Sequence, residues 1–190
     1  MTALRKLAYL MEHDYLAFEL NANMRHEYID GQTYAMAGAS ERHNRIAGNI
    51  FFHLRSATRG GPCAAFISDM KLRIALHSAY YYPDVMLTCN AHDNNEYYKQ
   101  QPSFIAEVLS PHTANLDRRE KLFVYQKIPS LRYYLLVSTE QLRVEYFVRD
   151  DQNEWKTALL EADETLEINL ENYRAVLTLR DIYEDVEVLF

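Results

Sequence analysis

The sequence lacks the features that mark several common protein classes. Only two of its 190 residues are cysteine, Cys63 and Cys89, too few for a disulfide framework. Neither has a zinc-type partner nearby, so both are expected to be small core residues in a reducing, cytoplasmic compartment. No apolar run approaches the roughly 20 residues of a membrane-spanning helix. Residues 1–19 also lack the apolar core of a signal peptide, and no membrane association is expected.

An excess of positive charge is absent as well, because the formal net charge is −7. The acidity is concentrated at one end: residues 150–190 contain 12 acidic and 3 basic residues, and residues 1–149 contain 15 acidic and 17 basic residues. Affinity for nucleic acid depends on local Lys and Arg side chains that face phosphates. The charge therefore neither excludes nor supports a nucleic-acid partner.

The composition is that of a globular protein, with 48% hydrophobic and 25% charged residues. Because the sequence shows no repeat, no low-complexity stretch and no linker, we expect one domain over residues 1–190. The acidic C-terminal extension, residues 150–190, is expected to pack on that domain.

The pattern of apolar and turn residues predicts alternating helices and strands. Ser40 is a suitable N-cap for a long helix over 40–58, and Asp30-Gly31 suits the turn of a hairpin over 25–37. Other helices are expected over 9–20, about 115–127 and 179–185. The remaining strands are expected over 63–68 paired with 70–75, over 80–89 and around Glu107, with a hairpin over 132–138 and 142–148 and weaker strands over 155–160 and 166–170. This order predicts an α/β (α+β) sheet with helices on its faces.

Two carboxylates stand within short apolar runs that resemble buried strands. Asp84 follows Pro83 and opens the run Asp84-Val85-Met86-Leu87, and Glu107 lies within residues 104–109. A buried, ionised carboxylate costs several kcal/mol unless a partner or a metal compensates its charge. Two acids 23 positions apart therefore suggest neighbouring strands that present their carboxylates to one divalent-cation site.

The helix after Glu107 adds residues of complementary chemistry. Asp117, Lys121 and Tyr125 are four residues apart and share one helix face, and a short connection would pack this helix against the sheet. A lysine beside two acids suits phosphodiester hydrolysis, because an ammonium group stabilises the charge that builds up on the phosphate. Oxygen donors of this kind suit Mg²⁺ or Mn²⁺.

Each of these residues also has a purely structural interpretation. Glu107 could face solvent on an edge strand, and Lys121 could be a solvated residue paired with Asp117. His43, near the start of the 40–58 helix, is more typical of a surface or capping residue than of a catalyst. The same helix carries four arginines that are candidates for contacts with DNA phosphates, although a solvated basic face is an equally simple explanation: Arg42, Arg45, Arg55 and Arg59.

Several segments resemble, in order over roughly residues 10–180, the Uma-two family of restriction endonucleases. These segments are Arg25-His26-Glu27-Tyr28-Ile29-Asp30-Gly31, Met36-Ala37-Gly38-Ala39-Ser40 with His43, Ser68-Asp69-Met70-Lys71, Tyr82-Pro83-Asp84-Val85, Glu107-Val108-Leu109-Ser110-Pro111, and Asp117 to Tyr125 leading to Pro129-Ser130-Leu131. That family is placed in the PD-(D/E)XK nuclease superfamily. The resemblance implies a restriction-endonuclease-like fold, a central mixed β-sheet flanked by helices, and Mg²⁺-dependent cleavage of DNA.

The resemblance also implies roles for individual residues. Asp84 corresponds to the aspartate of the motif, Glu107 to its second acid, and Glu27 to an acid from an early element. The sequence departs from the motif at Leu109, where a lysine is usual. The resemblance points to Lys121 on the next helix as its replacement, with Lys71 in reserve.

Three functional hypotheses follow. The first is a metal-dependent deoxyribonuclease in which Asp84 and Glu107 bind the metal, Lys121 stabilises charge and Glu27 supports the metal or the water. The second is a catalytically inactive nuclease-fold module that binds DNA or a protein partner, and the third is a metal hydrolase with another substrate. Duplex cutting usually needs two active sites, so the first hypothesis implies a homodimer. The apolar segment 186–190 could pack in the dimer interface or could close the core of the monomer.

Overall fold

The computed structural model describes residues 9–110, 120–170 and 173–188. Asp117, the first part of the helix expected over 115–127 and the last two residues of the chain lie outside these ranges. The helices are α1 (Glu12–Glu19), α2 (Glu41–Ala57), the short 3-10 helix η1 (Ala75–His77), α4 (Leu122–Tyr125) and α5 (Leu179–Ile182). The strands are β1 (His26–Ile29), β2 (Gln32–Ala35), β3 (Ala64–Ile67), β4 (Lys71–Ile74), β5 (Ala79–Tyr81), β6 (Val85–Thr88), β7 (Tyr98–Lys99), β8 (Pro102–Leu109), β9 (Tyr133–Ser138), β10 (Val144–Arg149), β11 (Trp155–Leu159), β12 (Leu166–Leu170) and β13 (Tyr173–Leu177).

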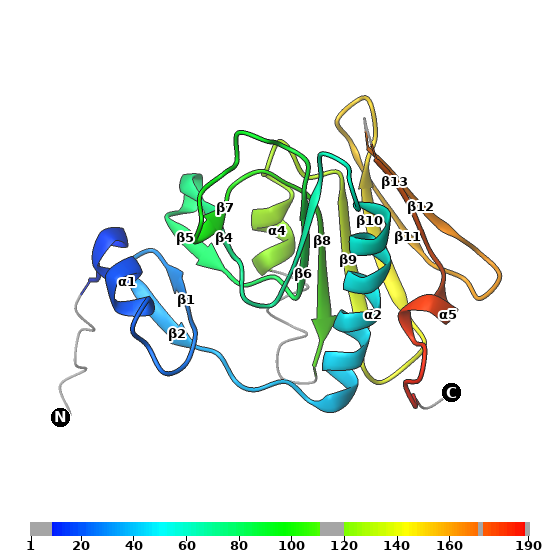
Figure 1. Cartoon of the computed structure of the whole chain (residues 1–190), viewed down its shortest axis with the longest axis horizontal. Coiled ribbons are helices and arrows are strands. Elements are labelled where there is room, and N and C mark those ends of the chain that lie inside the picture. The colour runs from blue at the N-terminus through cyan, green and yellow to red at the C-terminus, as the bar shows by residue number, and fades with distance from the viewer. Residues whose placement is uncertain (1–8, 111–119, 171–172, 189–190) are drawn as a thin grey trace.

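The strands form three sheets. Sheet A has the order β2-β1-β5-β4-β7, sheet B has the order β11-β10-β9-β8-β6-β3, and β12 pairs with β13. Within sheet B, β8 runs parallel to β9 and antiparallel to β6, so this sheet is mixed. The α+β class with a mixed central sheet is therefore confirmed. Figure 1 shows sheet A beside α1 at one end of the molecule and the β12–β13 hairpin at the other.

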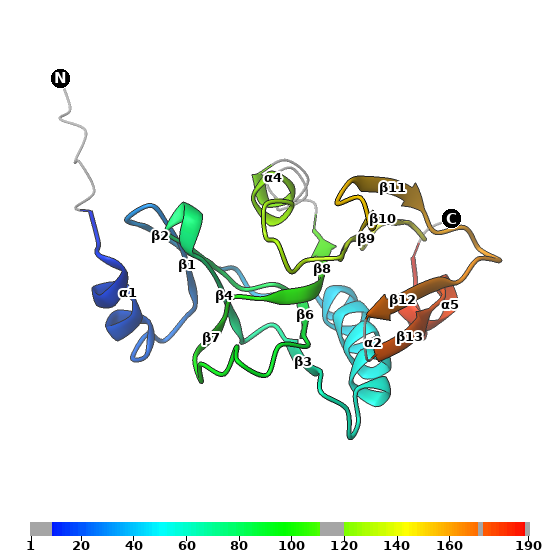
Figure 2. The same cartoon turned by 90° about the horizontal axis from the view of Figure 1, so that it is seen from above.

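Helices α2 and α4 lie on opposite faces of sheet B (Figure 2). The core on the α2 side contains Ile46, Ile50 and Leu54, which recur at the spacing expected for the buried stripe of this helix. The core on the α4 side lies between sheet A and sheet B and includes Tyr125 and Tyr81. This second core is the one that borders the candidate site.

The two strongest local signals of the sequence are confirmed. Helix α2 begins after Ser40, whose hydroxyl accepts a hydrogen bond from the backbone N–H of His43. Strands β1 and β2 form the expected hairpin, with Ile29 opposite Gln32. Asp30 and Gly31 both have positive φ angles, 44° and 83°, as the two-residue turn of such a hairpin requires. Gly31 also lacks a Cβ that would overlap the ring of Tyr9.

Two expectations about strand pairing are wrong. The segment 63–68 does not pair with 70–75: β3 pairs with β6 in sheet B, and β4 pairs with β5 in sheet A. The backbone N–H of Ser68, a residue with φ of 51°, donates to the carbonyl of Asp84 and helps to redirect the chain between the sheets.

The segment 80–89 is two strands, because Pro83 has no N–H for a sheet ladder. β5 ends before it and β6 begins after it, in different sheets.

The two cysteines form a disulfide bond, which corrects the expectation of two separate core thiols. Ala64 of β3 stands opposite Thr88 of β6, so the residues just beyond them, Cys63 and Cys89, also face each other. Their Cα atoms are 4.0 Å apart. Their separation of 26 residues could not indicate this pairing, because the pairing depends on the strand register.

The C-terminal elements cover the α2 side of the molecule. Strand β13, which the sequence pattern did not indicate, pairs with β12, and α5 begins at a capping box formed by Thr178 and Asp181. Val186 and Val188 pack against the core on the α2 side, so this part of the terminal apolar segment contributes to the monomer. Among the described residues, no helix is both long and apolar enough to cross a membrane.

Candidate active site

Asp84 and Glu107 stand opposite each other on adjacent strands. Val85 of β6 pairs with Ala106 of β8 in antiparallel register, which places residue 84 opposite residue 107. The backbone N–H of Val108 donates a hydrogen bond of 2.8 Å to Asp84 Oδ2. Among the described residues, none hydrogen-bonds Asp84 Oδ1. The strand adjacency expected from the sequence is therefore present, and the Asp84 carboxylate keeps one oxygen available.

The start of α4 brings two polar side chains to Glu107. Lys121 directly precedes the helix in helical conformation, and Tyr125 lies one turn further on the same face. The Nζ atom of Lys121 lies 3.3 Å from Glu107 Oε1, and the hydroxyl of Tyr125 donates a 2.8 Å hydrogen bond to the same oxygen. Glu107 is only 3% exposed and Lys121 6%. Neither side chain is solvated. The purely structural interpretation of each residue required solvent exposure, so both interpretations are wrong.

Glu27 reaches the same lysine from the other sheet. Its Oε1 atom lies 3.1 Å from Lys121 Nζ, and the backbone N–H of Tyr82 donates to that oxygen at 3.5 Å. Glu27 belongs to β1 of sheet A and Glu107 to β8 of sheet B. Lys121 therefore bridges an acid from each of the two large sheets.

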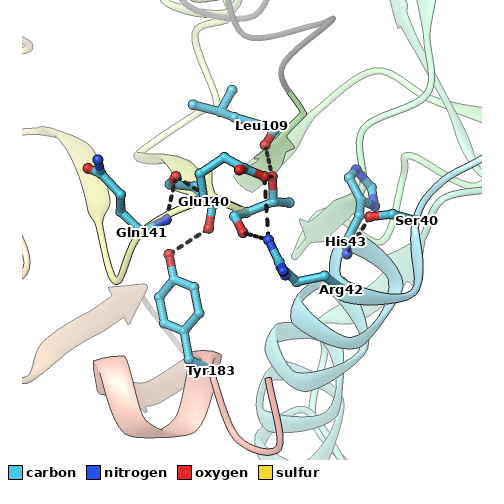
Figure 3. Close-up of polar contacts among 9 residues, drawn as sticks. Ser40, Arg42, His43, Leu109, Glu140, Gln141 and Tyr183 are labelled. Carbon is cyan, nitrogen blue, oxygen red and sulfur yellow. Dashed lines mark hydrogen bonds and ion pairs between the residues drawn. The ribbon is translucent and has the colours of Figure 1, made fainter. Parts of the chain in front are cut away.

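His43 lies in the first turn of α2 and also contacts the site. Its backbone N–H donates to the Ser40 hydroxyl, as Figure 3 shows, which agrees with the capping interpretation. Its ring atom Nε2, however, lies 3.2 Å from Asp84 Oδ2, with both side chains less than one-fifth exposed. Thus His43 and the Val108 amide both contact the same oxygen of the Asp84 carboxylate.

These side chains share an open groove of about 1490 Å³. Glu27, His43, Asp84, Glu107 and Lys121 all line it. Most other lining residues belong to the segment 34–45, which includes the end of β2 and the start of α2. Further lining residues come from 24–25, 68–69, 139–140 after β9 and 185–187 near the C-terminus. The volume is sufficient for a nucleotide-sized ligand above the carboxylates.

The four arginines proposed for phosphate contacts separate into two pairs. Arg42 and Arg45 line the groove, whereas Arg55 and Arg59 lie near or beyond the other end of α2, exposed and outside the groove lining. The guanidinium of Arg42 donates to the carbonyl of Thr139 at 2.9 Å and lies 3.4 Å from Glu140 (Figure 3).

The reserve lysine lies apart from the acids. Lys71 does not line the groove, and its ammonium group is 5.4 Å from the centre of the Tyr82 ring. Burial lowers the pKa of Lys71, an effect that the nearby Glu19 carboxylate opposes. Asp117, the other accessory candidate, lies outside the described residues. Lys121 is thus the lysine that contacts Glu27 and Glu107.

The tyrosines beside the acids are held in their neutral form. Burial, together with the negative charges of Glu107 and Glu27, raises the pKa of Tyr125 well above its ordinary value of 10. Burial and Glu27 raise the pKa of Tyr81 to about 12, against the opposing effect of Lys121. The ring of Tyr81 contacts Tyr125 edge to face at 5.7 Å. Tyr125 is therefore a proton donor toward Glu107 throughout the physiological pH range.

The donor set fits a divalent cation by charge and by chemistry. The carboxylates of Glu27, Asp84 and Glu107 line the same groove as the Lys121 ammonium group, and these four groups together have a formal charge of −2. Carboxylate oxygens are the ligands that Mg²⁺ and Mn²⁺ prefer. In the described part of the chain, no three His, Cys, Asp or Glu side chains form a ready-made ligand group. An ion here would therefore take its remaining ligands from backbone carbonyls and water.

Sequence reasoning missed several residues of the groove. Tyr82 precedes the Pro83-Asp84 pair, and its amide contacts Glu27. Tyr34 is exposed on the edge strand β2, and Glu140 follows β9. For Tyr34, the sequence signal was its place in the predicted hairpin, directly before the small and apolar residues 35–39. The position of Glu140 depends on tertiary packing that no local pattern encodes.

Comparisons with known proteins agree with this fold. Residues 13–179 match the model of the family Uma2, described as "Putative restriction endonuclease". The chain is 34% identical over 160 residues to the uncharacterized protein slr1290 of Synechocystis sp., a match that covers 84% of each chain. It is 37% identical over 145 residues to the uncharacterized protein sll1609 of the same organism, covering 75% of this chain and 82% of that one. A crystal structure titled as a putative nuclease of the DUF820 family, from Anabaena variabilis, has a similar fold, with a TM-score of 0.75, 14% identity and coverage of 94% of this chain and 99% of that one.

Proposed function

This chain belongs to the Uma2 family, and from that premise we propose that it is a divalent-metal-dependent endonuclease that hydrolyses DNA phosphodiester bonds. The observation that carries the proposal is the position of Lys121, whose ammonium group lies between Glu27 and Glu107 at 3.1 Å and 3.3 Å. A buried ammonium group beside two acids, in an open groove that also holds Asp84, suits phosphodiester hydrolysis because it can stabilise the charge that builds up on the phosphate.

Asp84 and Glu107 would hold a Mg²⁺ or Mn²⁺ ion, with a backbone carbonyl and water as further ligands. When bound, such an ion polarises the phosphate and lowers the pKa of a bound water. In the net reaction, the oxygen of a water molecule bonds to phosphorus, the P–O bond to one sugar breaks, and the proton released from water balances the one taken up by the leaving oxygen.

The chain's own residues position these groups. Lys121 donates hydrogen bonds toward the phosphate oxygens as negative charge builds up, and Glu27 orients the attacking water. Tyr125 fixes the Glu107 carboxylate through its 2.8 Å hydrogen bond. His43, in the first turn of α2, fixes the Asp84 carboxylate at 3.2 Å. Arg42 and Arg45, which line the groove, would contact flanking phosphates in competition with their carboxylate partners.

Metal binding and cleavage test the proposal separately. Isothermal titration with Mn²⁺ should show binding to the wild-type protein that Asp84→Ala removes. Asp151→Ala, which removes a fully exposed acid, is the matched control and should bind Mn²⁺ like the wild type. Nicking of plasmid DNA in Mg²⁺ or Mn²⁺ should be lost in Lys121→Met and kept in Lys156→Ala, where the lysine removed is exposed. Circular dichroism verifies that each variant is folded.

A pure wild-type sample that cleaves no form of DNA with either ion would overturn the proposal. If that sample still bound Mn²⁺ at Asp84, the chain would be a nuclease scaffold without this activity. Retention of cleavage by folded Lys121→Met would remove the role of Lys121.

A further inference from the structure

The groove has an unusual charge for a surface that binds DNA. Among the described residues that line it, eight are carboxylates, three are arginines and one is a lysine. Duplex DNA carries one negative charge per about 1.7 Å, and proteins that bind it do so by neutralising several phosphates with Lys and Arg. Even two divalent ions would only cancel the excess of negative charge in this groove. The described part of the lining therefore offers few cations to the two phosphate backbones of a duplex.

The three groove arginines are already paired with carboxylates. Arg42 also donates to the Thr139 carbonyl, which holds it against the turn after β9 (Figure 3). A phosphate that binds one of these guanidinium groups must compete with its carboxylate. The pairs are Arg25 with Asp69 at 2.7 Å, Arg42 with Glu140 at 3.4 Å and Arg45 with Glu41 at 3.0 Å.

One wall of the groove is apolar and contains an aromatic ring. Residues 34–39, Tyr-Ala-Met-Ala-Gly-Ala, all line the groove between β2 and α2. Tyr34 is 49% exposed, and its hydroxyl donates to Gln32 Oε1 at 3.1 Å, which keeps its ring on the edge strand. Exposed aromatic rings bind unpaired bases by stacking, at about 1–3 kcal/mol per base, without regard to sequence.

We propose that the groove takes single-stranded or frayed DNA, with an unpaired base on the Tyr34 wall and a single phosphate at Lys121. This inference rests on the proposed nuclease function and specifies its substrate. A single strand supplies an exposed base for the apolar wall and brings fewer phosphates to the paired arginines. A paired duplex buries its bases in the stack, so the wall would have no partner.

Fluorescence anisotropy can test the inference with a labelled 20-nucleotide single strand and the blunt duplex of the same sequence. The binding mixture contains Ca²⁺ in place of Mg²⁺, and gel electrophoresis verifies that the DNA stays uncut. We expect the wild-type protein to bind the single strand at least tenfold more tightly than the duplex. With one or two phosphates neutralised, the slope of log K against log salt for the single strand should be about −0.7 to −1.4.

Three variants separate stacking from other effects. Tyr34→Ala should weaken binding of the single strand by about 5- to 150-fold, which corresponds to one lost base stack. Tyr34→Phe should bind like the wild type, because the ring remains. Tyr97→Ala is the matched control: Tyr97 is 50% exposed but does not line the groove, and its removal should change nothing.

Preferential binding and cleavage of the duplex, with a salt slope steeper than about −5, would overturn the inference and leave the proposed nuclease function in place. Equal loss of affinity in Tyr34→Ala and Tyr97→Ala would also overturn it. If the wild-type protein neither bound nor cleaved any DNA, the proposed function and this inference would both be wrong.

Discussion

Removal of one hydroxyl group, in Tyr125→Phe, tests the electrostatic description of the site. The ring stays in place between Tyr81 and Tyr134, whose rings it contacts edge to face at 5.7 Å and 5.4 Å. The substitution removes only the 2.8 Å hydrogen bond to Glu107 Oε1. Hydrogen bonds to charged groups contribute about 1.5–3 kcal/mol to stability. We expect the free energy of unfolding to fall by that amount at pH 8.

In a chain of this length, 1 kcal/mol lowers the melting temperature by about 2–4 °C, so the expected decrease is roughly 3–12 °C. Differential scanning calorimetry and urea titration measure it. Tyr81→Phe is the control, because Tyr81 belongs to the same aromatic cluster but its hydroxyl has no hydrogen-bond partner among the described residues. It should change the stability by less than about 0.5 kcal/mol.

The pH dependence gives a second, independent measurement. The pKa of Tyr125 is raised in the folded protein, so its contribution to stability is fully present below pH 10 and is lost as the pH rises further. Above pH 10 the unfolded chain releases the Tyr125 proton, whereas the folded protein keeps it. The free energy of unfolding therefore falls by up to about 1.4 kcal/mol per pH unit. The stability difference between wild type and Tyr125→Phe should therefore be constant from pH 7 to 9 and shrink above pH 10. Equal stability of the two proteins at pH 8, or a difference that grows above pH 10, would refute the reasoning.

Three further predictions concern other parts of the molecule. Reduction of the Cys63–Cys89 disulfide, or its replacement by two alanines, should lower the free energy of unfolding by about 3.5 kcal/mol, the loop-closure value for its 26-residue separation; an unchanged melting temperature with dithiothreitol would contradict the bond. Ser40→Ala should cost about 1 kcal/mol in urea titration, because the N-cap of α2 is lost, and Ser40→Asp should restore most of it. Glu19→Gln should cost about 1–3 kcal/mol, because the buried Glu19 carboxylate accepts hydrogen bonds from the His26 amide at 2.9 Å and the Tyr82 hydroxyl at 2.8 Å; a neutral effect in thermal unfolding would mean that these bonds contribute nothing.

Local sequence signals predicted the elements whose structure depends on neighbouring residues. The α2 helix followed from its cap and its apolar stripe, and the β1–β2 hairpin from the Asp30-Gly31 turn. Strand pairing was less accessible, because it depends on which sheet the chain enters. The proline that interrupts the 80–89 segment was visible in the sequence, but the change of sheet at that point was not. Strand β13 and the disulfide could not be predicted for the same reason, because both depend on which strands pair.

The candidate site was predictable to the extent that it follows from spacing. Asp84 and Glu107 were found because charged residues in apolar strand runs are rare, and Lys121 and Tyr125 because they share a helix face. The contact of His43 with Asp84 could not be derived, since it joins the N-terminal turn of α2 to the start of β6. The pairing of Arg25 with Asp69 and of Arg42 with Glu140 was inaccessible in the same way. The pair of Arg45 with Glu41, by contrast, has the four-residue spacing of one helix face.

The bridge made by Lys121 has a consequence for how the molecule can be shortened. A chain that began after β2 would retain the aspartate, the second glutamate and the lysine in their strands and helix, yet the ammonium group would have lost its neighbour from sheet A. The proposed chemistry would therefore depend on the strand that carries Glu27 as well as on the elements that carry the other three groups. Any ligand that engages Glu27 and Glu107 together must also hold the two halves of the protein in contact, and would protect both from heat.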